Sequence, residues 1–130
     1  MSDRPLIAPN LLNPLINAQS MATSITGPAT IIQRLPGISY DISWTGTPTG
    51  TFQVQVSNTY STSQNGTEAS SGNWTTLPTS AFQGTYPVPS GSPGNGFLDV
   101  VGTEAYAVRL VYTASSGTGT LTVVPAAKVL

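Results

Sequence analysis

The sequence predicts an all-β fold, an antiparallel β-sandwich of the jelly-roll kind. Apolar and polar residues alternate with a period of two in several short stretches, and Gly, Pro, Ser and Thr separate these stretches. No stretch shows the period of an amphipathic helix. Because parallel strands need long crossover connections, usually helices, the strands are expected to be antiparallel. At 130 residues the chain fits one domain that buries roughly two-thirds of its unfolded surface.

The first nineteen residues predict an extended arm. Pro5, Pro9 and Pro14 interrupt them, and proline biases both itself and its predecessor toward extended backbone. The arm carries six aliphatic side chains: Leu6, Ile7, Leu11, Leu12, Leu15 and Ile16. We therefore divide the chain into an N-terminal arm, 1–19, and a β-sandwich domain, 20–130.

The strands of the sandwich follow in order along the chain. Two candidates, 21–26 and 29–35, flank Gly27-Pro28, and alternation is clear in 38–44 and 52–56. A long polar loop, 57–73, leads to a short strand at 74–77, and a second loop covers 83–96. Residues 97–101 form a strand, and 106–112 and 118–124 form a hairpin. The expected core consists of Tyr40, Ile42, Trp44, Phe52, Val54, Val56, Val108, Leu110, Leu121 and Val123.

The composition argues against several classes of function. The chain has four Lys or Arg, five Asp or Glu, no His and no Cys, for a net charge of −1. Nucleic-acid binding needs many basic side chains, and a membrane helix needs about 20 apolar residues in a row. The N-terminus lacks the pattern of a signal peptide, so synthesis in the cytoplasm is expected. Without His, Cys or clustered carboxylates, we expect no catalytic residues, no metal and no cofactor.

Two groups of residues allow both a structural and a functional interpretation. Asp99 and Glu104 flank a turn, as a glycosidase pair would, but solvated turn charges are the preferred reading. Arg109 lies on a strand face of Ala and Val, where it either pairs with Asp41 or Glu104 or anchors an interface.

Three aromatic residues lie in or beside the long loops. Tyr60, Trp74 and Tyr86 form a sugar-stacking platform in one reading, although Trp74 at the start of a strand more often belongs to a core.

The arm is the strongest candidate for partner binding. Burying its six aliphatic side chains contributes about 9–18 kcal/mol, at about 1.5–3 kcal/mol each. Ordering some 19 residues of backbone costs about 19–38 kcal/mol. The cost of ordering the arm thus exceeds the contribution from burial. An arm lying on its own domain remains the alternative, but backbone pairing with a neighbouring subunit offsets the remaining cost more readily. Predicted partner-binding residues are therefore Leu6, Ile7, Leu11, Leu12, Leu15, Ile16 and Arg109.

Several strand sequences together resemble a known class of proteins. The stretches are Phe52-Gln-Val-Gln-Val-Ser-Asn58, Asn73-Trp-Thr-Thr-Leu77, Phe97-Leu-Asp-Val100 and the hairpin from Tyr106 to Val123 with its Ser-Gly-Thr-Gly turn. Over residues 38–124 the chain resembles small β-sandwich virion proteins of tailed bacteriophages, most of all capsid decoration (cement) proteins. The resemblance implies a non-enzymatic structural protein on the capsid surface of the virion. Its implied partners are the major capsid protein and other copies of itself, in a homo-oligomer. The arm has no counterpart in this resemblance.

A second function from another class stays open. A carbohydrate-binding or adhesin module, associated with a tail or fibre, uses the same kind of sandwich and binds sugars through loop aromatics. Binding to capsids rather than to glycans distinguishes the first function from the second.

Overall fold

A computed structural model describes residues 14–32, 37–63, 67–79, 85–101 and 105–127, and these residues form strands and connecting loops without an α-helix. This confirms the predicted all-β class. The strands are β1 (Ile16–Ser20), β2 (Ile25–Thr26), β3 (Thr30–Ile31), β4 (Gly37–Trp44), β5 (Thr49–Ser57), β6 (Ser61–Thr62), β7 (Glu68–Ser70), β8 (Thr75–Thr76), β9 (Gly94–Val101), β10 (Ala107–Ser116) and β11 (Thr120–Ala127).

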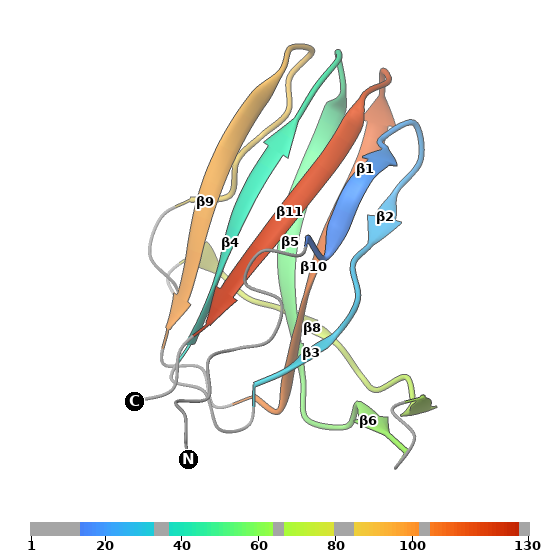
Figure 1. The fold of residues 1–130 in the computed structure, drawn as a ribbon, viewed down its shortest axis with the longest axis vertical. Coiled ribbons are helices and arrows are strands. Elements are labelled where there is room, and N and C mark those ends of the chain that lie inside the picture. The colour runs from blue at the N-terminus through green and yellow to red at the C-terminus, as the bar shows by residue number, and fades with distance from the viewer. Residues whose placement is uncertain (1–13, 33–36, 64–66, 80–84, 102–104, 128–130) are drawn as a thin grey trace, which may run out of the picture.

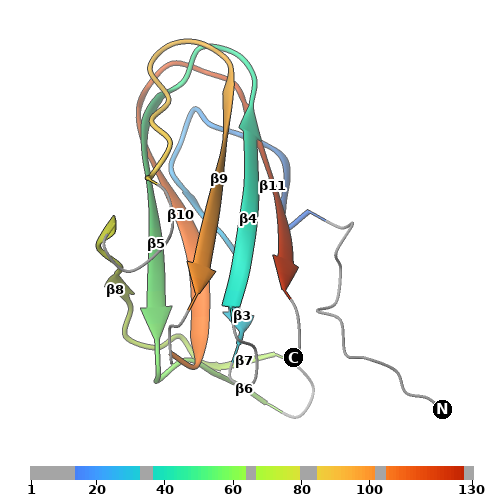
Figure 2. The same ribbon diagram turned by 90° about the vertical axis from the view of Figure 1, so that its left-hand side faces the viewer.

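The main strands form two antiparallel sheets that pack face to face (Figures 1 and 2). One sheet has the order β1-β11-β4-β9, and we call it sheet A. The other, sheet B, has the order β2-β10-β5-β8, and β3 also pairs with β10. The short strands β6 and β7 pair only with each other, beyond one end of the sandwich.

The order of pairing identifies the topology. The first main strand pairs with the last (β1 with β11), and the second pairs with the last but one (β2 with β10). Further inward, β4 pairs with β9, and β5 pairs with β8. A long hairpin rolled up in this way is a jelly roll, in which two sheets enclose one core. The jelly-roll architecture expected from the sequence is thus present.

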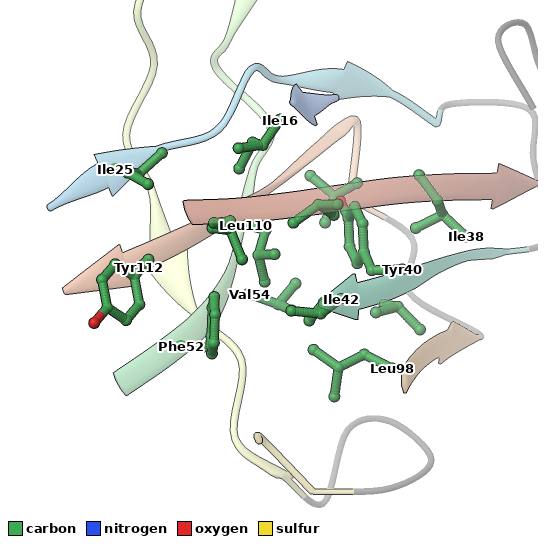
Figure 3. Close-up of a cluster of buried hydrophobic side chains, with 14 of the residues drawn as sticks. Ile16, Ile25, Ile38, Tyr40, Ile42, Phe52, Val54, Leu98, Leu110 and Tyr112 are labelled. Carbon is green, nitrogen blue, oxygen red and sulfur yellow. The ribbon is translucent and has the colours of Figure 1, made fainter. Parts of the chain in front are cut away.

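The core fills the space between the sheets (Figure 3). Nine of the ten side chains predicted to be buried are buried, and the tenth, Val56, is half-buried and packs against the others. The period-two pattern succeeded because one face of each strand meets the opposite sheet. Residues outside the ten named from the sequence complete the core: Ile16, Met21, Ile25, Ile32, Ile38, Leu98, Val100 and Tyr112.

Strand β9 begins at Gly94, although residues 94–96 were expected to belong to a loop. The inward positions of this segment are glycines because other side chains occupy the space. A Cβ at Gly94 would lie 2.7 Å from the ring of Trp44, and one at Gly96 would lie 2.7 Å from the ring of Pro87. The indole nitrogen of Trp44 also donates to the carbonyl of Ser92, at 2.9 Å. The segment before β9 is therefore held against the flank of the sandwich.

Two tyrosines of the core have buried hydroxyls. Tyr40 and Tyr112 are fully buried, and neither hydroxyl meets a hydrogen-bonding partner among the described residues. Burial raises the pKa of Tyr40 far above its usual range. We therefore expect each of these hydroxyls to lower the stability of the core relative to a phenyl ring of the same shape.

Candidate functional site

A cluster of polar and aromatic side chains lies on the outer face of sheet B. Arg109 on β10 is directly opposite Gln55 on β5, and its Nε donates to Gln55 Oε1 at 2.9 Å. The guanidinium carbon of Arg109 lies 4.2 Å from the centroid of the Trp74 ring. The rings of Trp74 and Tyr60 are 5.8 Å apart between centroids and tilted by 53°. We call Arg109, Gln55, Trp74 and Tyr60 the Arg109 cluster.

The loop between β5 and β8 brings the aromatic residues to this face. The buried side chain of Ser57 accepts hydrogen bonds from the backbone of Thr59 and Tyr60, each at 3.1 Å. At the return of the loop, the backbone of Asn73 donates to Thr59 Oγ1 at 2.7 Å. Short hydroxyl side chains make such local turns readily. Tyr60 and Trp74, at the two ends of the loop, are consequently neighbours.

The part of this loop that leads back to β8 depends on a glycine. Gly72 has a φ of +78°, which L-residues with a side chain rarely adopt. A Cβ there would also lie 2.7 Å from the oxygen of Ser57. The indole nitrogen of Trp74 then donates to the carbonyl of Ser71 at 2.6 Å, which fixes the orientation of the ring toward Arg109.

The cluster holds a positive charge at a half-buried position. Burial lowers the pKa of Arg109, and the nearby negative charge of Glu68 on β7 raises it. An arginine remains charged in either case. Within the described part of the chain, Arg109 makes its hydrogen bond only to Gln55, so its terminal nitrogens are available as donors. This arrangement suits a ligand or partner that offers oxygen acceptors beside an aromatic ring.

The structure corrects the predicted partners of Arg109. Asp41 lies on β4, exposed on sheet A, whereas Arg109 lies on the outer face of sheet B. The two sheets separate them, so the expected ion pair with Asp41 is wrong. Glu104 lies outside the described residues. Arg109 instead contacts Trp74, which is half-buried and does not belong to the core.

The predicted three-ring platform forms only in part. Tyr60 and Trp74 are neighbours, but the hydroxyl of Tyr86 binds elsewhere. It donates to the carbonyl of Leu77 at 2.7 Å and accepts from the backbone of Val54 at 3.0 Å. Tyr86 thereby joins β5 to the end of β8 and packs against the core. Sequence reasoning placed all three rings beside the loops but had no means to separate this structural tyrosine from the other two.

The described carboxylates do not share one buried site: Asp41 and Glu68 are exposed, and Asp99 is half-buried. On sheet A, Asp41 is opposite Phe97 and Asp99 is opposite Ser39, so the two acids are diagonal neighbours on one face. Glu104, the expected companion of Asp99, lies outside the described residues. Among the residues described, no three acids come together as a metal site would require. The absence of enzymatic activity stays a prediction.

The predicted partner-binding arm needs one correction. Leu6, Ile7, Leu11 and Leu12 lie outside the described residues, so their role stays a prediction. Ile16 is buried in the core, 3% exposed, and Leu15 packs against that core. Strand β1 pairs with β11, and the amide of Leu15 donates to Val123 at 2.8 Å. Leu15 and Ile16 thus belong to the sandwich, and the predicted boundary after residue 19 is wrong.

Comparison with protein-family models, with curated proteins and with solved structures gives no match to this chain. In the described residues, no helix has the length and hydrophobicity needed to cross a membrane.

Proposed function

We propose that this protein is a non-enzymatic structural protein of a virus particle, a capsid decoration protein of a tailed bacteriophage. In this proposal it binds the outer surface of the capsid and bridges neighbouring capsomers. The observation that supports it is the strand order of the two sheets. The jelly-roll order recurs in viral capsid proteins and in lectins, and it adds to the resemblance of residues 38–124 to virion proteins.

The filled core supports a role at the surface. Large side chains such as Tyr40, Phe52 and Tyr112 occupy the space between the sheets. Function therefore falls to the faces, edges and loops of the sandwich. Charged residues make up 7% of the chain, so contacts through hydroxyl, amide and apolar groups depend little on salt. Such contacts suit a protein that stays bound to a particle under varying conditions.

Strand β1 supplies a mechanical link in this proposal. The segment 1–13 precedes a strand that pairs with β11 and buries Ile16 in the core. If a capsid subunit binds the arm, a force on the arm acts on β1 along the direction of the strand. The hydrogen bonds between β1 and β11 and the burial of Ile16 then resist this force together. We assign Leu6, Ile7, Leu11 and Leu12 to capsid contacts on this basis.

The Arg109 cluster favours a second candidate function, carbohydrate binding in a tail-associated or adhesin module. Sugar sites combine an aromatic face with guanidinium and amide groups that bind hydroxyls, and the cluster offers all three. The guanidinium of Arg109 already covers one face of the Trp74 ring, which leaves a smaller stacking surface than an open platform.

Co-sedimentation with capsids tests the first function. Capsids of the phage that encodes the chain, prepared without this protein, should pellet the full chain but not a variant that lacks residues 1–13. Trp74→Ala should pellet as well as the full chain. Binding of the full chain to a glycan array, lost in Trp74→Ala, together with no binding to capsids, would instead establish the carbohydrate function.

A further inference from the structure

Strand β9 is an open edge of sheet A. It has eight residues, pairs with β4 on one side without a bulge, and is the last strand of its sheet. Figure 2 looks onto the side of the sandwich where β9 is outermost. In the described part of the chain, no backbone group of β9 bonds to any strand other than β4. The edge is long enough to accept another strand.

The other described edges are protected against such pairing, and β9 is not. Strand β1 has an irregular register and a left-handed residue, Ala18, with a φ of 50°. Strands β2, β3 and β8 have two residues each. Natural proteins block edges with short strands, bulges, prolines or charged side chains, especially lysines. Residues 94–101 contain no proline, lysine or arginine, and their single charged side chain is Asp99.

The hydrogen-bond pattern identifies which groups of β9 point outward. The amide of Thr45 donates to Thr120, so the odd-numbered residues of β4 bond to β11 and the even-numbered ones bond to β9. Their partners on β9 also have even numbers, because Ile42 is opposite Gly96. The odd-numbered residues of β9 therefore direct their amide and carbonyl groups to the free edge: Asn95, Phe97, Asp99 and Val101.

Two of these residues, Asn95 and Phe97, have exposed side chains, and the side chain of Asp99 is half-buried. Phe97 is 60% exposed, in the middle of the strand, and Asn95 and Asp99 lie two residues to either side. On the inward face, Leu98 and Val100 are fully buried. The strand is thus held firmly by its own core while it presents an apolar centre and free backbone groups to the outside.

We propose that β9 pairs antiparallel with β9 of a second copy, across a two-fold axis at Phe97. Each Phe97 is then opposite its counterpart, and Asp99 of each copy is opposite Asn95 of the other. Three opposed pairs make about six backbone hydrogen bonds. The two copies of sheet A become one continuous eight-stranded sheet.

This register is the one that fits the side chains best. A shift of one residue would place outward side chains opposite inward ones, which the pleat forbids. A shift that places Asp99 opposite itself brings like charges together, and like charges on opposed positions are unfavourable. The register at Phe97 instead pairs two aromatic rings, and a surface that complements itself is what a two-fold dimer requires.

Sedimentation velocity of the isolated full chain tests the proposal without reference to capsids, so it stands or falls separately from the proposed function. The wild-type protein should dimerise as its concentration rises. Phe97→Lys should raise the dimer dissociation constant at least about tenfold, because two lysines would then face each other. Ile31→Lys, on the far edge of sheet B and 38% exposed, should leave the dimer unchanged. Circular dichroism should find both variants folded.

Complementary charges provide the sharper measurement. Phe97→Lys and Phe97→Glu should each be monomeric alone and should form a heterodimer when mixed. In the wild type, amide hydrogen exchange at Asn95, Phe97 and Asp99 should slow as the concentration rises. A wild type that stays monomeric, a dimer that Phe97→Lys leaves intact, or a charged mixture that stays monomeric would overturn the proposal.

Discussion

One substitution, tyrosine to phenylalanine, should have opposite effects at different positions of this sandwich. At Tyr40 and Tyr112 the hydroxyl is buried without a partner among the described residues. A buried polar group left unpaired costs about 1–3 kcal/mol. The hydroxyl of Tyr112 lies close to the backbone of Gly50, since a Cβ added to that glycine would be 2.6 Å from it. We expect each substitution to raise the free energy of unfolding by about 1 kcal/mol.

At Tyr86 the same change should be destabilising. Its hydroxyl donates to the carbonyl of Leu77 and accepts from the amide of Val54. Each hydrogen bond contributes about 0.5–1.5 kcal/mol, so Tyr86→Phe should lower the free energy of unfolding by about 1–3 kcal/mol. The three variants remove the same atom, and only its surroundings differ.

Urea unfolding followed by tryptophan fluorescence measures all three variants. The midpoint should rise for Tyr40→Phe and Tyr112→Phe and fall for Tyr86→Phe, with slopes equal to that of the wild type. For a domain of this size about 1 kcal/mol corresponds to about 3–5 °C in the thermal midpoint. Equal losses at all three positions would refute the reasoning, because they would show that the core hydroxyls have partners.

Three further expectations follow from the structure. Because burial raises the pKa of Tyr40, its hydroxyl stays protonated in the folded state while the unfolded chain releases its proton near pH 10. The urea midpoint should therefore be level below about pH 10 and fall above it, less steeply in Tyr40→Phe; an unchanged slope would count against this. Gly72→Ala should cost at least about 2 kcal/mol in urea unfolding, and more than Gly91→Ala, which has a similar positive φ but open space around it. Deleting residues 1–13 should leave the thermal midpoint nearly unchanged, whereas deleting 1–19 removes most of β1 and should lower the free energy of unfolding by more than about 3 kcal/mol; equal midpoints would contradict the placement of β1.

The alternating strands were predictable because their pattern is local. In β4, for example, Ile38, Tyr40 and Ile42 face the core and polar residues separate them. Strand β1 has no such pattern: Ile16 is buried and the next four residues are exposed. Its pairing with β11, about a hundred residues away, makes it a strand. A sequence read in short windows contains no signal for this.

The Arg109 cluster could not be predicted for the same reason. Its members come from β5, β10 and the two ends of one loop, and only the folded sheet makes Arg109 a neighbour of Trp74. A clue was present in the sequence: Tyr60 and Trp74 are the aromatic residues at the two ends of an otherwise polar loop. Gly94 and Gly96 led to the wrong prediction of a loop at 94–96, because glycines are typical of loops. Only the structure shows that the rings of Trp44 and Pro87 occupy the space that side chains at these two positions would need.

The loop that carries β6 and β7 has a practical consequence for protein engineering. It leaves β5 at Ser57 and returns to the neighbouring strand β8, so its two ends are fixed side by side. Further out, the amide of Ser63 donates to the carbonyl of Thr67 at 2.7 Å. A peptide inserted between these two residues would have both its ends fixed by this hydrogen bond. Lengthening a loop whose ends are already held together costs little entropy. The protein therefore offers a site for displaying foreign peptides away from its core.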